Sequence, residues 1–192
     1  MKTLALALLL GLTPGAPGIG DSYYPRLGNG GYDVGHYDID LAYADGRIHG
    51  TTTITATARQ GLSRFDLDFL GLTISSLKVN GTTADYRRDG QELIITPAEG
   101  LPEGATFTVE VAYAGRPAPV QEPSLGKSGW VPTSDGAVTV SEPSGSMTWF
   151  PVNDHPTDKA TFSYRIKVPE GCLLYTSPSP RDRTRSRMPS SA

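Results

Sequence analysis

Residues 36–59, HYDIDLAYADGRIHGTTTITATAR, decide the fold because they alternate apolar and polar residues with a period of two. Such alternation is typical of a strand with one buried and one solvated face. The pair Asp45-Gly46 interrupts the pattern, and this dipeptide favours the tight turns that join antiparallel strands. The stretch therefore predicts a β-hairpin, with these side chains facing a core: Tyr37, Ile39, Leu41, Tyr43, Ile48 and Ile54.

The same alternation recurs along the chain, and no segment of helical period separates the strands. In 64–71, RFDLDFLG, the pattern places Phe65 and Phe69 inward and Asp66 and Asp68 outward. Residues 105–113 and 159–168 repeat it, and Asn80-Gly81 predicts a further turn. We predict an all-β domain, an antiparallel β-sandwich or saddle over residues 32–171, preceded by a flexible, turn-rich arm at 21–31.

Residues 1–20 have the form of a secretory signal peptide. One lysine precedes an apolar run over 4–12, and small residues and prolines follow. A buried helix is the alternative, but the run is too short to span a bilayer and Pro14 comes directly after it. We expect cleavage after Gly18 or Gly20 and a secreted, extracellular protein. No cysteine follows the run, so we expect no lipid or other membrane anchor.

The net charge of the chain is −3, but its last residues are basic. Removing Lys2 and residues 172–192, which carry four arginines and one aspartate, leaves −7 for residues 21–171. An acidic domain repels phosphate backbones, so we expect no nucleic-acid partner.

The basic stretch itself, 172–192, CLLYTSPSPRDRTRSRMPSSA, has no strand period. A nucleic-acid-binding tail and a linker are two interpretations. The stretch also resembles, codon for codon, the translation of a transposase sequencing adapter. We therefore predict a non-native, adapter-derived tail and a true sequence that differs after Gly171.

Familiar catalytic and metal motifs are absent from the sequence. Residues 124–128, SLGKS, lack the first glycine and the α/β setting of a phosphate-binding loop, and there is no G-x-S-x-G. His36, His49 and His155 are scattered without the spacing that zinc ligands usually show. We assign no catalytic and no metal-binding residue. Residues 115–146 are rich in Gly, Pro and Ser and are candidates for functional loops.

The most informative segment is 141–169, SEPSGSMTWFPVNDHPTDKATFSYRIKVP. Trp149 and Phe150 are expected to fill a core edge, and Asp154 and Pro156 to form a tight turn before the last strand. The order Glu142, then FPVNDHP at 150–156, then KATF at 159–162 resembles the end of the amino-terminal domain in the aminopeptidase N family, zinc metallopeptidases of the H-E-x-x-H (gluzincin) type. The resemblance extends over residues 32–171.

The resemblance implies a role for Glu142 in binding the free α-amine of a peptide substrate, because a carboxylate can accept charge-assisted hydrogen bonds from an ammonium group. A solvated loop carboxylate is the alternative. The glutamine that the family often has two residues earlier is Val140 here, and PSGSMTW at 143–149 lacks the family's usual arginine.

In that family, zinc and catalysis belong to a separate domain. None of the 192 positions begins an H-E-x-x-H, so we expect this chain to bind no zinc, to be inactive alone, and to pack on a missing catalytic domain. A second function stays open at this stage: a free-standing secreted β-sandwich that binds a partner through the 115–146 loops.

Overall fold

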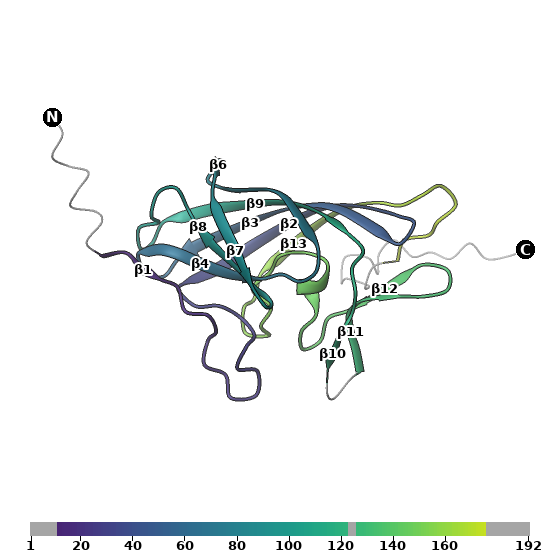
Figure 1. Cartoon of the computed structure of the whole chain (residues 1–192), viewed down its shortest axis with the longest axis horizontal. Helices are drawn as coiled ribbons and strands as arrows, with labels where there is room; N and C mark the ends of the chain where they lie inside the picture. The colour runs from purple at the N-terminus through teal and green to yellow at the C-terminus, as the bar shows by residue number, and fades with distance from the viewer. Residues whose placement is uncertain (1–10, 123–125, 176–192) are drawn as a thin grey trace, which may run out of the picture.

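The computed structural model describes residues 11–122 and 126–175, and within them the regular secondary structure is almost entirely strand (Figure 1). The elements in chain order are β1 (Thr13–Pro14), β2 (Tyr32–Ala44), β3 (Arg47–Ala58), β4 (Leu62–Asp68), β5 (Thr73–Val79), β6 (Thr82–Thr83), β7 (Asp85–Asp89), β8 (Glu92–Thr96), β9 (Thr106–Gly115), β10 (Val120–Glu122), β11 (Gly126–Pro132), β12 (Ala137–Val140), the short 3₁₀ helix η2 (Ser146–Thr148) and β13 (Thr161–Lys167).

The largest sheet has six strands in the order β13-β2-β3-β9-β5-β6. Its centre is the predicted hairpin of β2 and β3, in which Tyr37 lies opposite Ile54. Asp45 and Gly46 at the turn have φ angles of 52° and 70°, the left-handed conformation that tight hairpin turns require at both central positions. The turn and the strand alternation of residues 36–59 are therefore confirmed.

A four-stranded sheet, β1-β4-β8-β7, packs on one face of the large sheet (Figure 1). Phe65 of β4 meets Phe107 of β9 with ring centroids 5.2 Å apart, and Phe69 meets Tyr113 at 5.1 Å. Alternate residues of the facing strands fill the space between the sheets, as sheet-on-sheet packing requires. The largest fully buried side chains are Tyr37, Phe65, Phe69, Phe107, Phe150, Ile39, Leu41, Ile48, Ile54, Leu62, Leu67 and Leu77.

The all-β fold and its sandwich or saddle form are confirmed, but two strand pairs are parallel rather than antiparallel. β13 runs parallel to β2, and β1 runs parallel to β4. Parallel neighbours need a long crossover connection, and the more than one hundred residues between β2 and β13 allow one. A two-residue period shows which face is buried, but it carries no information on strand direction.

The prediction that Asp66 and Asp68 face solvent is wrong. Both are buried, at 2% and 0% exposure. The physical reason is that β4 is covered on both sides at Asp68: the large sheet lies on one side, and on the other Asn29 donates to the Asp68 carboxylate and the segment around Val152 pairs with the Asp68 backbone. Leu27 and Asn29 are themselves buried, so this end of the predicted flexible arm is part of the packed domain.

Several strands lie where the sequence predicts none. β7 is exposed along its whole length, and β10, β11 and β12 form a small three-stranded sheet inside the stretch predicted as loops. β1 lies within the predicted signal peptide, and Gly15 N–H donates to Arg64 O at 2.8 Å. Among the described residues, no helix is long and apolar enough to cross a membrane. The tail beyond residue 175 lies outside the described residues.

The alternation of β2 gives a direct test of the fold. Ile39 is fully buried, whereas its neighbour Asp40 is exposed and pairs with Arg165. We expect Ile39→Ala to lower the free energy of unfolding by about 2–5 kcal/mol, because it leaves a cavity. Asp40→Ala should cost about 1 kcal/mol or less, as surface ion pairs do. Urea unfolding of both variants checks this. Equal losses of unfolding free energy would contradict the assignment of Ile39 to the buried face of β2 and Asp40 to its solvent face.

Candidate functional site

Glu142 lies in the loop that follows β12, and its side chain is exposed to solvent. β12 is the edge strand of the small sheet, pairing with β11 from Gly129 opposite Val140 to Pro132 opposite Ala137. The loop therefore leaves a short hairpin that stands beside the large sheet (Figure 1). The one residue implicated in substrate binding by resemblance is thus at the surface and accessible.

Buried hydroxyl groups hold the backbone on both sides of Glu142. The Ser128 hydroxyl, on β11, is placed to donate to the carbonyl oxygen of Val140 at 2.8 Å or to that of Ser144. Ser144 is fully buried, and its hydroxyl donates to Glu122 Oε1 at 2.5 Å. Ser128 can therefore hold the backbone either two residues before or two residues after Glu142, and Ser144 ties the second side to Glu122.

Two glycines let this loop approach β11 closely. A Cβ atom on Gly129 would lie 2.6 Å from the carbonyl oxygen of Gly145, and a Cβ atom on Gly145 would lie 2.5 Å from the Gly129 nitrogen. Real Cβ contacts are essentially never this short, so any other residue at either position would force the two segments apart. Their φ angles, 87° and 125°, also favour glycine.

The Asp154 carboxylate holds the next part of the same segment. Its Oδ2 accepts hydrogen bonds from Gly145 N–H at 2.8 Å and Met147 N–H at 3.1 Å, at the start of η2. Asp154 is buried, and burial raises the pKa of its carboxyl, while the amide hydrogen bonds oppose that rise. Asp154 thus stabilises the backbone that leads away from Glu142, beyond the turn-forming role predicted for it.

The aromatic residues of the motif anchor the loop in the core, as predicted. Phe150 is 1% exposed and packs edge-on to Tyr37, with centroids 5.8 Å apart. Trp149 lies 4.5 Å from Phe150 and 6.2 Å from Trp130. The Tyr37 hydroxyl accepts a hydrogen bond from Asn153 N–H at 3.0 Å. The motif at 150–156 is therefore fixed to β2 and β11 together.

The carboxylate of Asp68, at the end of β4, accepts hydrogen bonds from three separate segments. Its Oδ2 accepts hydrogen bonds from Asp154 N–H at 2.9 Å and Asn29 Nδ2 at 3.4 Å, and its Oδ1 accepts one from Gln91 Nε2 at 2.7 Å. Burial raises the pKa of Asp68 to about 7, and the nearby Asp154 adds to the rise. Burial, with the charge of Asp68, raises the pKa of Glu92 to about 8.

Sequence reasoning did not identify Ser128, Ser144 or Asp68 as parts of this site. For Asp68 the sequence pattern was misleading, because the alternation placed its side chain on the solvent face of the strand. Ser128 and Ser144 lie in a Ser-rich stretch with no pattern that separates them from neighbouring serines. Asp154 had a signal in the D-x-P turn, but that signal says nothing of its bonds to Gly145 and Met147.

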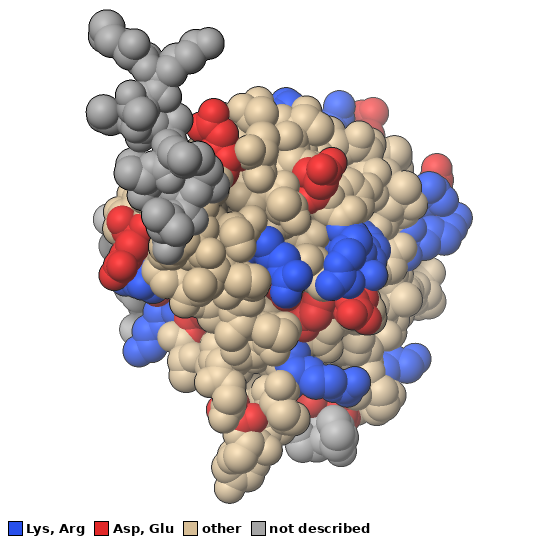
Figure 2. Space-filling view, turned by 60° about the vertical axis from the view of Figure 1, so that its left-hand side comes forward, with Lys and Arg blue, Asp and Glu red and all other residues tan. Residues whose placement is uncertain are grey.

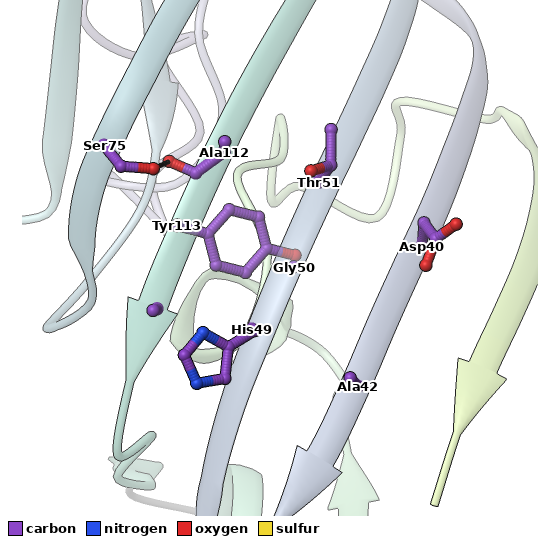
Figure 3. A pocket seen from close by; sticks show the side chains of 9 residues that line it. Asp40, Ala42, His49, Gly50, Thr51, Ser75, Ala112 and Tyr113 are labelled. Carbon is purple, nitrogen blue, oxygen red and sulfur yellow. Dashed lines mark hydrogen bonds between the residues drawn. The ribbon is translucent and has the colours of Figure 1, made fainter.

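The three histidines lie apart and serve separate local roles. His36 Nδ1 lies 2.7 Å from Thr161 Oγ1 at the surface, and buried His155 lies 3.3 Å from Asp21. His49 borders a shallow hollow on the large sheet, lined also by Asp40 and small residues (Figure 3). Within residues 11–122 and 126–175 no group of three His, Cys, Asp or Glu side chains could hold a metal ion.

That hollow includes no residue of the Glu142 loop. Its lining combines polar side chains, those of Asp40, His49, Thr51, Ser75 and Tyr113, with the small residues Ala42, Gly50, Ala112 and Ala114. On the face of the molecule that Figure 2 shows, basic and acidic side chains are interspersed and form no continuous basic field. The Glu142 loop therefore remains the candidate site.

Comparison with known proteins identifies the class to which this fold and loop belong. Three of the solved structures to which this chain is similar are structures of zinc metallopeptidases. They are a point mutant of a two-domain M1 zinc metallopeptidase bound to L-arginine (34% identity, 84% of this chain and 40% of that chain, TM-score 0.74), an M1 zinc metallopeptidase from Deinococcus radiodurans (34%, 84% and 39%, 0.73), and a mutant of the Deinococcus enzyme bound to a Tyr-Ser-Ala substrate (33%, 85% and 40%, 0.73).

Residues 34–187 match the sequence profile of the Peptidase M1 N-terminal domain. The chain therefore belongs to the Peptidase M1 N-terminal domain family, which confirms the resemblance to aminopeptidase N. It spans about two-fifths of the length of the solved peptidases. The match runs into residues 172–187, whose origin from a sequencing adapter stays a prediction.

The raised carboxyl pKa values predict how stability depends on pH. A carboxyl whose pKa is higher in the folded than in the unfolded chain stabilises the fold at low pH, and this contribution is lost as pH rises through the folded value. For Asp68 the loss falls between about pH 4 and about pH 7. We expect the free energy of unfolding of the Asp68→Asn variant to fall less over this window than that of the wild type, by on the order of 2 kcal/mol.

Urea unfolding at two pH values measures this difference. The first is pH 4.5, about half a unit above the lower limit of that window, and the second is pH 7.5, about half a unit above its upper limit. The matched control is Asp89→Asn, because Asp89 is exposed on β7. Its pH dependence should equal that of the wild type. If Asp68→Asn also keeps the wild-type pH dependence, Asp68 does not hold an extra proton in the folded protein.

Proposed function

We propose that this chain is the amino-terminal domain of a secreted zinc aminopeptidase, in which it packs on a catalytic domain and presents Glu142 to the free α-amine of a peptide substrate. The observation that carries the proposal is the placement of Glu142: an exposed carboxylate on a loop whose flanking backbone is fixed by Ser128, Ser144 and Asp154. An exposed side chain on a rigid loop is well suited to contact a ligand.

The related structures support the chemical class of the ligand. They were solved with L-arginine, L-tryptophan and a Tyr-Ser-Ala substrate. Each of these molecules carries an α-amine, which is positively charged at neutral pH. A carboxylate is the side chain that binds such a group through charge-assisted hydrogen bonds. The match to one domain of a larger peptidase does not favour the alternative of a free-standing binding module.

Zinc has no set of ligands in the part of this chain that the structure describes, and we propose that it is bound by the H-E-x-x-H of the catalytic domain, where it would activate the water that attacks the peptide bond. The contribution of this domain is binding and orientation. Secretion is part of the proposal and is supported by the signal-like residues 1–20.

A hybrid enzyme tests the role of Glu142. Residues 21–171 replace the corresponding domain of the Deinococcus radiodurans peptidase, and KM and kcat are measured on a tripeptide with a free amine. We expect Glu142→Gln to raise KM about 10- to 100-fold, because a charge-assisted hydrogen bond contributes about 1.5–3 kcal/mol. Glu103→Gln, at an exposed position between β8 and β9, is the matched control and should leave KM unchanged. An unchanged KM for Glu142→Gln would show that Glu142 is a solvated loop residue.

The parent reading frame is tested separately by genomic sequence across the codon for Gly171. We expect the frame to continue into an H-E-x-x-H motif, with a native sequence that replaces residues 172–192. A native stop codon within a few tens of codons of Gly171 would contradict the proposal that a catalytic domain follows.

A further inference from the structure

The arm (residues 21–31) closes over a pair of carboxyl groups, those of Asp68 and Glu92. The two residues lie directly opposite each other in the antiparallel pairing of β4 with β8. Side chains at such positions share a face of the sheet with Cβ atoms about 5 Å apart, and like charges there are destabilising. Asp68 is fully buried and Glu92 is half-buried. The closed arm therefore disfavours a state in which both carboxyls are charged.

Side-chain amides hold the arm against this pair. Asn29 Nδ2 donates to Asp68 Oδ2 at 3.4 Å, and the Asn29 side chain also hydrogen-bonds the Glu92 carboxyl. Gln91 Nε2, in the turn between β7 and β8, donates to Asp68 Oδ1 at 2.7 Å and to the carbonyl oxygen of Arg26. The closed position of the arm and the state of the two carboxyls thus depend on the same hydrogen bonds.

The arm fits closely where it passes the segment at 150–156. Asn29 N–H donates to Asn153 Oδ1 at 2.6 Å, and Asn153 Nδ2 donates to the carbonyl oxygen of Asn29 at 3.3 Å. A Cβ atom on Gly28 would lie 2.6 Å from His155 Cβ, so the backbone of the arm lies directly on that side chain. Release of the arm would break these contacts and let water reach the carboxyl pair.

A proton on the pair suits the closed arm. Among the described residues neither Asp68 nor Glu92 forms an ion pair, and Glu92 Oε2 and Asn29 Oδ1 are buried without a hydrogen-bond partner. A proton on Glu92 would supply a donor and remove one of two like charges. Burial raises the pKa of both carboxyls, and the charge of Asp68 raises that of Glu92 further. The closed arm therefore keeps a proton that a water-exposed pair would release at the same pH.

The groups around the pair are mainly acidic. Three carboxyls face it from β4, β7 and the segment at 150–156: Asp66, Asp89 and Asp154. The basic groups on the surrounding elements are Arg26, which borders a surface hollow beside Glu92, and Arg64 and Arg87, which lower the pKa of Asp66. Tyr32 of β2 stays a neutral phenol, because burial raises its pKa. The acidic groups add to the repulsion within the pair.

The other end of the arm responds to protonation in the same direction. Asp21 Oδ2 lies 3.3 Å from Nε2 of buried His155, and this contact becomes an ion pair only when the imidazole is protonated. Asp21 Oδ1 accepts hydrogen bonds from Tyr23 N–H at 2.7 Å and Tyr24 N–H at 3.1 Å, which orders the start of the arm. A proton at either end therefore favours the closed arm.

We propose that the arm is a pH-sensitive strap, which stays closed while the Asp68–Glu92 pair holds a proton and opens when both carboxyls are charged. A group whose pKa is raised in the closed state favours that state at low pH, and its contribution is lost as pH rises through the raised value. For this pair the loss extends to about pH 8, the value for Glu92. Opening also breaks the contacts between Asn29 and Asn153.

Amide hydrogen exchange of the full 192-residue chain tests this, because protection factors corrected for the intrinsic effect of pH report local opening. The reporter is the amide of Asn29, and the reference is the amide of Ile54 in the centre of the large sheet. We expect Asn29 to be less protected than Ile54. Its protection should fall about ten-fold or more between pH 5.5 and pH 8.5, because one released proton shifts an equilibrium about ten-fold per pH unit.

Glu92→Gln tests the pair, because it keeps the shape of the carboxyl and removes its charge. At pH 8.5 this variant should protect the Asn29 amide about ten-fold better than the wild type does. Glu99→Gln is the matched control, because Glu99 is exposed just after β8, and it should exchange as the wild type does. An Asp21→Asn variant removes the ion pair with His155, and we expect most of the pH response to remain in it.

Three results would overturn the inference. The first is protection of Asn29 that does not change with pH. The second is a pH response that Glu92→Gln leaves intact or that Asp21→Asn abolishes, since the response would then belong to another group such as His155. The third is protection of Asn29 equal to that of Ile54 at both pH values, because the arm would then open only when the whole domain unfolds.

Discussion

The buried carboxylate of Asp68 is the interaction on which the arrangement of this domain depends. It lies at the end of β4 and joins three segments that are distant in sequence: the arm through Asn29, the β7–β8 turn through Gln91 and the family motif through Asp154. A carboxylate removed from water is costly unless donors surround it. These donors therefore stabilise Asp68 and hold their own segments in place. Burial still disfavours the charged form of the carboxyl, and the pKa of Asp68 is raised as a result.

The Glu142 loop is supported by a chain of contacts that starts at Asp68. Asp68 accepts from the Asp154 backbone, the Asp154 side chain accepts from Gly145 and Met147, and the Gly145 backbone fits against Gly129. Each contact places the next group, so the exposed residue at the end has a defined position without packing of its own. Such support allows a surface carboxylate to meet a ligand at little cost in conformational entropy.

The sequence predicted those parts of the fold that depend on local patterns. Alternation indicated the hairpin of β2 and β3 and the inward faces of β4 and β9, and the Asp45-Gly46 and Asn80-Gly81 pairs indicated turns with the expected positive φ angles. It failed where a residue's surroundings come from distant segments. Asp68 was assigned to solvent because alternation assumes one wet face, and the parallel β13 could not be deduced because strand order is set by non-local pairing. Glu142 was found by resemblance alone, and its support by Ser128 joins residues that no local pattern connects.

The aromatic rings of β13 connect the last described strand to the segment behind Glu142. Phe162 and Tyr164 share a face of the sheet with buried Tyr37, yet they retain nearly half of their exposure. Both rings contact Trp149 or Phe150, which also anchor the segment behind Glu142. Phe162, Tyr164 and the motif residues behind Glu142 therefore belong to one packed unit.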